Sequence, residues 1–192
     1  MALAGLPMQG ICPFTETESG GVKTETLGTG TYTSRIMKFA ASPTREVAEI
    51  YAGDAKDDEE EGAVSGTITV ERSQMSLAEE AAYLGHTYTE EDGLVAKDTD
   101  TAPYLRCAAL ARGIDKGKVY YRVTCYMKVK FSVAGDEYET KGKSPALKSR
   151  QLSGTLFANK DGVFKTVKDF TGETALTSAT AFFKQMLNIT EA

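Results

Sequence analysis

Residues 100–155 decide the fold class, through three runs: DTAPYLRCAALARG (residues 100–113), GKVYYRVTCYMKVKFSV (117–133) and EYETKGKSPALKSRQLSGT (137–155). Apolar and aromatic residues dominate the first two runs, which predict the strongest strands of the chain, over 103–112 and 117–133. A turn at 115–117 would join these strands, and a further strand is predicted over 151–159. The stretch therefore indicates a protein built mainly from β-strands.

The preceding part of the chain predicts a hairpin with a strongly acidic loop. Strands are expected over 31–41 and 45–51, separated by the bend or edge position that Pro43 favours. Polar and apolar residues alternate over 63–71, which is typical of a half-buried strand. The intervening residues 53–62 hold six acidic residues and one basic residue, so we expect them to form an acidic loop at the tip of the hairpin.

Two helices and a small hairpin are predicted outside these strands. Ser76 and Glu79 have the Ser-x-x-Glu spacing of a capping box, which predicts a short helix that ends near Leu84. Residues 86–97 predict two short strands with a turn between them. A final helix is expected over about 174–187, because four apolar residues fall on one stripe at helical spacing: Leu176, Ala179, Phe183 and Leu187.

The order of elements favours a single domain. Residues 1–30 show little periodicity and are interpreted as an N-terminal arm or lead-in, and residues 31–192 as one domain. We expect a mainly β, α+β fold: a β-sandwich or a partly open, barrel-like sheet, with a short helix and a flanking C-terminal helix.

The composition is that of an ordinary globular protein. The chain has 192 residues, of which 41% are hydrophobic and 26% charged, enough for one sizeable core. No apolar run approaches the roughly 20 residues of a membrane helix, and the N-terminus lacks the pattern of a signal peptide. We therefore expect a chain made in the cytoplasm. Three cysteines match neither a disulfide framework nor a metal site and are interpreted as small buried apolar residues: Cys12, Cys107 and Cys125.

Charge is segregated along the chain. Residues 1–115 carry 9 basic and 20 acidic residues, a net charge of −11. Residues 116–150 carry 9 basic and 3 acidic residues, a net charge of +6. This segregation favours complementary faces that meet between copies, although ordinary solvated surfaces would also account for it.

No catalytic or ligand-binding motif emerges from the sequence. The single histidine, His86, follows Gly85 at a predicted helix end, where a capping role is favoured over catalysis. A nucleophile elbow is missing, and so is a phosphate-binding glycine loop. The acidic loop fails as a calcium site because Ile68 stands where a bidentate Glu is required. We therefore expect no enzyme activity, no cofactor and no bound metal.

Five short pieces carry a family resemblance: AAYLGHT (81–87), DTAPYLRCAAL (100–110), YYRVTCYMKVKF (120–131), EYETKGKSP (137–145) and SGT (153–155). In their order and spacing these pieces resemble the major tail proteins of long-tailed bacteriophages with non-contractile tails. The resemblance extends over roughly residues 31–160. It does not cover the first 30 residues or the acidic loop.

The resemblance implies a structural role. Proteins of this family have a β-sandwich or barrel-like domain with a flanking helix, form hexameric rings, and stack into a tail tube through which the genome leaves the virion. The partners would be copies of the chain itself, together with tape measure, tail terminator and baseplate or distal tail proteins. The subunit would lie in the virion tail after assembly in the host cytoplasm, with no membrane contact. Genomic DNA would pass without specific binding, since an acidic or neutral lumen repels its phosphates.

Other functions stay open from the sequence. A tube protein of a contractile injection or secretion system would share the ring-forming fold, and a neighbouring sheath gene would identify it. A monomeric β-sandwich binding module would display the acidic loop to a partner and would stay monomeric in solution.

The charge segregation predicts a contact between subunits. We expect its acidic side to be Asp57, Asp58, Glu59, Glu60 and Glu61, and its basic side to be Lys141, Lys143, Lys148 and Arg150. Replacing Lys141→Glu together with Lys143→Glu should hinder polymerisation, measured by electron microscopy. Unchanged tube formation would count against the pairing. Exposed ion pairs contribute only about 0–1 kcal/mol each, so backbone pairing and apolar burial must supply most of the affinity.

Overall fold

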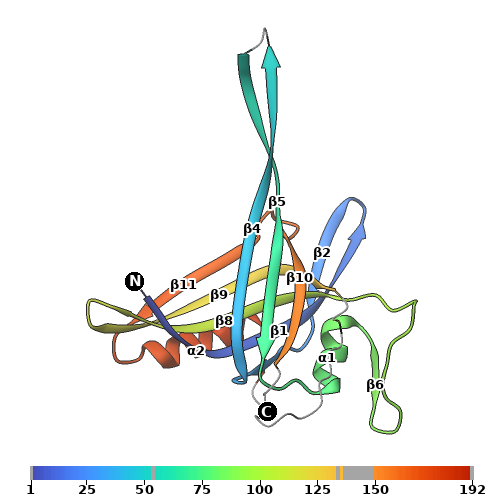
Figure 1. Cartoon of the computed structure of the whole chain (residues 1–192), viewed down its shortest axis with the longest axis vertical. Coiled ribbons are helices and arrows are strands. Elements are labelled where there is room, and N and C mark those ends of the chain that lie inside the picture. Colours follow the sequence, from blue (N-terminus) through green and yellow to red (C-terminus); the bar gives the residue numbers. More distant parts are fainter. Residues whose placement is uncertain (1, 53–54, 133–134, 136–148, 191–192) are drawn as a thin grey trace, which may run out of the picture.

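The chain folds into one large antiparallel sheet, a small second sheet and two helices (Figure 1). The computed structural model describes residues 2–52, 55–132, 135 and 149–190, with the backbone alone described at 2–4 and 48–59. The strands are β1 (Ala2–Ser19), β2 (Val22–Leu27), β3 (Thr31–Thr33), β4 (Ile36–Ala52), β5 (Ala55–Arg72), β6 (Thr87–Thr89), β7 (Gly93–Val95), β8 (Tyr104–Asp115), β9 (Lys118–Phe131), β10 (Arg150–Phe157) and β11 (Lys165–Thr171). The helices are α1 (Leu77–Leu84) and α2 (Ala175–Met186).

The large sheet has nine strands, all paired in antiparallel fashion. Its order is β2-β1-β8-β9-β10-β5-β4, while β3 pairs with β1 and β11 pairs with β9. β6 and β7 form the second, two-stranded sheet. The predicted mainly β, α+β fold is therefore confirmed.

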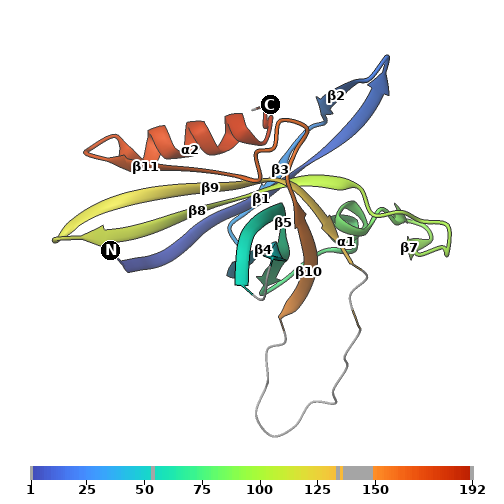
Figure 2. The same cartoon turned by 90° about the horizontal axis from the view of Figure 1, so that it is seen from above.

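The large sheet folds over on itself and builds two apolar cores. One core lies inside the fold, where strands from both halves of the sheet meet α1: Ile11, Ile68, Val70, Tyr83, Leu84, Leu105, Cys107, Tyr126, Val129, Phe131, Leu152 and Leu156. The other lies between the sheet and α2, which covers β8, β9 and β11 (Figure 2): Cys12, Ala108, Leu110, Val123, Cys125, Met127, Ala179, Phe183 and Leu187. β4 contacts β1 across the fold, yet these two strands are not paired in the described part of the chain. The architecture is thus a partly open barrel.

Most of the locally encoded elements lie where the sequence predicts them. Ser76 caps α1 through a complete capping box with Glu79, and Gly85 ends the helix in the left-handed conformation. β6 and β7 occupy the region predicted as two short strands. β8 and β9 are joined by a tight turn at Lys116 and Gly117, whose φ angles of 48° and 78° suit a two-residue hairpin loop.

The interpretation of residues 1–30 as an arm or lead-in is wrong. β1 lies inside the sheet and pairs with β8 over most of its length, with β2 and β3 on its other side. Residues 9–12 are all buried, because both faces of the strand are covered. A strand covered on both faces shows no alternation of polar and apolar residues, so its pattern is lost from the sequence.

The hairpin is confirmed, but its predicted acidic loop is wrong. β4 runs through Pro43 as one strand, and β5 begins at Ala55, so residues 55–62 belong to a strand. Pro43 is tolerated because β4 is the last strand of the sheet, and a proline there removes no hydrogen bond from a central ladder. The acidic residues fit a strand because this part of the hairpin projects into solvent.

A strand missed by the sequence analysis lies at 165–171. This strand, β11, pairs with β9 from Tyr120 to Tyr126. Its sequence KTVKDFT is short and charged, and only Phe170 packs on the α2 core.

Gly113 provides a test of the packing inside the sheet. A Cβ atom at Gly113 would lie 2.2 Å from the ring of Tyr120, which is only 3% exposed, so the ring would have to shift within the packed interior. We expect Gly113→Ala to lower the free energy of unfolding by about 1–3 kcal/mol in urea denaturation. Gly5→Ala in β1 is the control, because nothing lies within 4 Å of its added Cβ. Equal effects of the two substitutions would contradict this account.

Candidate assembly interface

The most prominent candidate site is the projecting end of the β4–β5 hairpin, residues 43–66, which we name the arm (Figure 1). Partner residues on the core-facing side of the hairpin run outward in the order Phe39–Val70, Ala41–Ile68, Pro43–Gly66, Arg45–Val64 and Val47–Glu61. Val70 and Ile68 are fully buried, whereas Val47 is 46% exposed. The row is therefore apolar where it begins in the core and mixed along the arm, where Val47 and Val64 lie beside the charged Arg45 and Glu61.

The arm leaves the body at a fixed point. Pro43 and Gly66 are partners there, and Gly66 has a φ of 148°. A side chain at Gly66 would place its Cβ 2.3 Å from the carbonyl oxygen of Ser42, so this position requires glycine. The register of β4 with β5 shifts between Arg45 and Val47, which adds a β-bulge and local twist. The direction of the arm is thus set by its own backbone.

Several strand edges of the large sheet carry no partner within the described residues, among them those of β4, β11 and the first part of β1. β4 pairs only with β5, and β11 pairs only with β9. The first part of β1, residues 2–8, pairs only with β8. Such edges present unpaired backbone N–H and C=O groups, which favour pairing with another chain.

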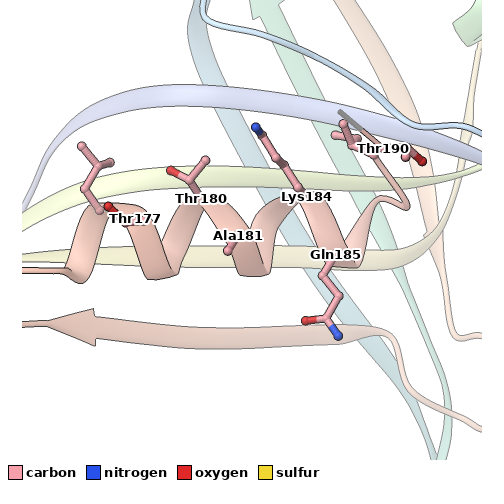
Figure 3. A pocket seen from close by; sticks show the side chains of 8 residues that line it. Thr177, Thr180, Ala181, Lys184, Gln185 and Thr190 are labelled. Carbon is pink, nitrogen blue, oxygen red and sulfur yellow. The ribbon is translucent and has the colours of Figure 1, made fainter. Parts of the chain in front are cut away.

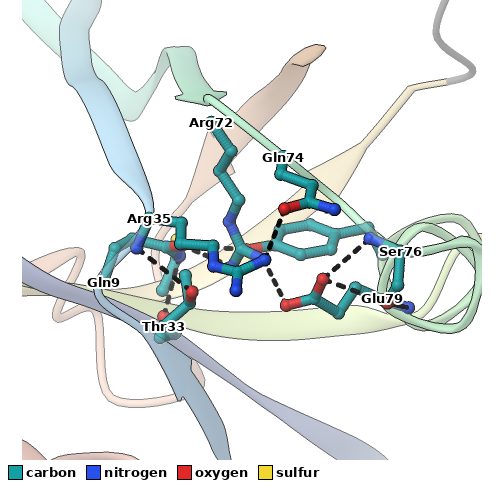
Figure 4. Close-up of polar contacts among 10 residues, drawn as sticks. Gln9, Thr33, Arg35, Arg72, Gln74, Ser76 and Glu79 are labelled. Carbon is teal, nitrogen blue, oxygen red and sulfur yellow. Dashed lines mark hydrogen bonds and ion pairs between the residues drawn. The ribbon is translucent and has the colours of Figure 1, made fainter. Parts of the chain in front are cut away.

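A buried polar network holds the base of the hairpin against α1 (Figure 4). Arg72, at the end of β5 and 2% exposed, donates to Gln9 Oε1 at 2.6 Å, to the Tyr83 hydroxyl at 2.7 Å and to Glu79 Oε1 at 2.9 Å. The Tyr83 hydroxyl also donates to Gln9 Oε1 at 3.1 Å. Burial raises the pKa of Tyr83, which therefore stays a neutral partner of Arg72. The network joins β1, β5 and α1 at one point.

Glu79 is the charged partner of Arg72 and also completes the helix cap. Burial alone would raise the pKa of its carboxyl. Hydrogen bonds from Ser76 and the nearby guanidinium of Arg72 outweigh that effect and hold the pKa below its usual value. Glu79 is therefore ionised at neutral pH and pairs with the buried cation.

The acidic residues predicted to contact another subunit lie on the arm. Asp57, Asp58 and Glu59 belong to β5, but their side chains are outside the described residues. Glu60 and Glu61 are exposed, and Glu61 forms a cross-strand ion pair with Arg45. Their contact with a second subunit stays a prediction.

Of the basic residues predicted for that contact, Arg150 alone lies within the described residues. Lys141, Lys143 and Lys148 lie outside the described residues. Arg150 begins β10, pairs with Glu80 of α1 and donates to the carbonyl oxygen of Gly135 at 3.0 Å. The guanidinium of Arg150 is therefore held within its own chain.

Sequence reasoning missed Arg72, although a signal was present. Ile68, Val70 and Arg72 alternate on the buried face of β5, so the strand pattern places a charged residue where the core requires a partner. The nearby capping box supplies that partner through Glu79. Only the strand alternation and the capping box together indicate that Arg72 is a buried charge with a partner.

The remaining candidate groups have structural roles. All three cysteines are buried and free, and burial raises the pKa of Cys107 and of Cys125 to about 12, so these thiols stay protonated. The His86 backbone N–H bonds to the carbonyl oxygen of Ala81, and its Nδ1 lies 3.0 Å from Asp100 Oδ2. The described residues contain no cluster of potential metal ligands and no helix that could span a membrane.

A shallow groove of about 620 Å³ runs along the outer face of α2 (Figure 3). Its lining is mostly small and polar: Leu176, Thr177, Thr180, Ala181, Lys184, Gln185, Ile189 and Thr190. The open shape and this lining fit a solvated helix surface better than a small-molecule site, which is usually concave and apolar.

The Arg72 network predicts a specific pH dependence. Because the folded pKa of Glu79 lies below its ordinary value of 4.5, the stabilisation from its charge is complete above pH 4.5 and is lost as the pH falls through the folded value. We expect wild type to exceed Glu79→Gln in free energy of unfolding at about pH 7, and the difference to narrow below pH 4.5. Glu18→Gln, an exposed substitution in β1, is the control. A difference independent of pH would contradict the assignment.

No protein-family model matches this chain, and no curated protein matches it.

Proposed function

We propose that this chain is the tube-forming structural subunit of a bacteriophage tail, which assembles into hexameric rings that stack around a channel for DNA. The observation that carries the proposal is a four-stranded strip made of β1 residues 2–8, β8, β9 and β11, with an open edge on each side. α2 covers one face of this strip. A strip with two open edges and one covered face is suited to joining neighbours side by side.

Strand directions support closure of such a ring. All pairings in the strip are antiparallel, so β1 and β11, at its two edges, run in opposite directions. Rotation about a ring axis preserves these directions. The β11 edge of one copy would therefore meet the β1 edge of the next as an antiparallel pair, which continues the existing sheet.

The arm supports the same proposal. A two-stranded ribbon alone in water is marginally stable, and the outer edge of β4 is open over a 17-residue strand. Packing against a neighbouring subunit would cover the exposed Val47 and pair the free edge. Pairing of this kind removes the aggregation risk that an isolated edge carries.

Net charge supports the role as a conduit. The chain carries a net charge of −5, so each added copy makes the ring more acidic. An acidic assembly repels the phosphate backbone and favours passage of DNA over binding.

Electron microscopy and sedimentation of the purified protein test the proposal. We expect rings or tubes at high protein concentration. Edge pairing is tested by Val167→Pro and Lys168→Pro, two exposed neighbours on β11. Because adjacent N–H groups of a strand point to opposite sides, one proline removes a bond to β9 and the other removes only an outward N–H. The variant that removes only an outward N–H should keep the melting temperature of wild type and lose ring formation.

Two outcomes would contradict the proposal. A wild-type protein that stays monomeric at all concentrations would exclude the tube and favour a binding module. Rings formed equally well by both proline variants would exclude ring closure through β11.

A further inference from the structure

Two surface features lie at opposite ends of β8 and have opposite charge. The first is residues 86–100, which we name the lobe; it carries five acidic residues and one lysine, a net charge of −4. The second is residues 112–122, which we name the tip; it carries four basic residues and one aspartate, a net charge of +3. β8 has 12 residues, so at about 3.3 Å per residue the two features are about 40 Å apart. Figures 1 and 2 both show them at opposite ends of the molecule.

The lobe is held in a defined conformation. Asp100 Oδ2 accepts the Lys97 backbone N–H at 2.9 Å and lies 3.0 Å from His86 Nδ1, so the two ends of the lobe are joined. Thr89 Oγ1 accepts the N–H of Asp92 at 2.9 Å and fixes the turn. α1 packs against both β6 and β7. The lobe can therefore present its side chains without an ordering step.

The lobe presents acidic and aromatic side chains together. Glu90 and Glu91 are exposed at the turn, and Tyr88 is 40% exposed beside them. The salt bridges formed within the described residues include neither glutamate. These charges remain available for an external partner.

The tip presents a matching set. Lys116 and Lys118 are exposed on either side of Gly117, and neither takes part in a salt bridge within the described residues. Directly behind them, Ile114 and Val119 are opposite each other and are 40% and 37% exposed. The tip thus offers an apolar pair bordered by lysines, which complements an aromatic ring bordered by glutamates.

The positions of the lobe and the tip, at opposite ends of the strands, fit a contact between rings. If copies join through the edges of the strip, as the proposed function requires, they are added across the strands, and the strand ends then face along the tube. We propose that the lobe of one subunit docks on the tip of a subunit in the adjacent ring, with Tyr88 against Ile114 and Val119 and the glutamates against the lysines. The inference rests on the proposed function and names a second contact, distinct from ring closure.

The contact would repeat six times between two rings. Each single contact is small and exposed, but contacts made at the same time by one rigid ring reinforce each other. Charge complementarity would also exclude a reversed ring, which would bring lobe against lobe or tip against tip. All rings of the tube would therefore stack in the same direction.

Charge reversal tests the contact. The tip variant is Lys116→Glu with Lys118→Glu, and the lobe variant is Glu90→Lys with Glu91→Lys. Each alone should still form rings but should form at least about tenfold fewer tubes at about 50 mM salt, where surface charges are only partly screened. Rings of the two variants mixed in equal amounts should stack again, because the introduced lysines of one variant then meet the introduced glutamates of the other, and the original glutamates meet the original lysines.

Matched controls keep the test specific. Lys23→Glu with Lys160→Glu makes the same change in net charge as the tip variant, but outside the lobe and the tip, and should leave tubes unchanged. Melting temperatures establish that each variant is folded. Should a reversed variant fail to fold, Lys116→Gln with Lys118→Gln is the milder substitute, with a smaller loss of tubes expected.

The outcomes separate this inference from the proposed function. Tubes formed equally well by wild type and both reversed variants would overturn the lobe–tip contact and leave the tube function intact. Failure of the mixed rings to stack would overturn the charge pairing, and loss of rings along with tubes would overturn its placement between rings. A wild-type protein that never assembles would overturn both proposals.

Discussion

The structure depends on how one strand, β9, divides its pairing between two neighbours. Its first part, Tyr120 to Tyr126, pairs with β11, and its last part, Lys128 to Phe131, pairs with β10. The register with β8 shifts between these parts, and three consecutive residues, Cys125 to Met127, are buried. Tyr126 belongs to the inner core and Met127 to the core under α2. This irregularity lets one branch continue as a strip beneath the helix while the other folds over with β10, β5 and β4.

The second constraint is the position of Arg72. A buried cation is costly unless it is paired, and here its partners come from β1 and α1. Elements far apart in sequence must therefore assemble before the charge is satisfied. The arm projects from the hairpin whose base is held by the Arg72 network, so a rigid base supports a projecting ribbon.

The parts predicted correctly are those with short-range physical causes. The Ser76–Glu79 cap, the Lys116-Gly117 turn and the buried stripe of Ala179, Phe183 and Leu187 are all specified within a few residues. Leu176, predicted on the same stripe, is instead 46% exposed, because it lies on the outer side of the first turn of α2. β1 was missed because burial on both faces removes the alternation on which strand prediction depends. The acidic segment was misread because composition favoured a loop, whereas backbone pairing with β4 made it a strand. The sequence predicts a free surface charge at Arg150 because its partner, Glu80, is 70 residues away in sequence.

The number of strands in the strip has its own consequence. Four strands that alternate in direction leave the two outer edges antiparallel to each other, so copies related by rotation can join for any number of copies. An odd number would bring parallel edges together at every junction. An even number of strands therefore permits ring closure but does not determine the number of subunits in the ring. In the proposed ring, the number of subunits would be set by curvature, that is, by the angle that the bulge in β9 and the twist of the strip introduce between one copy and the next.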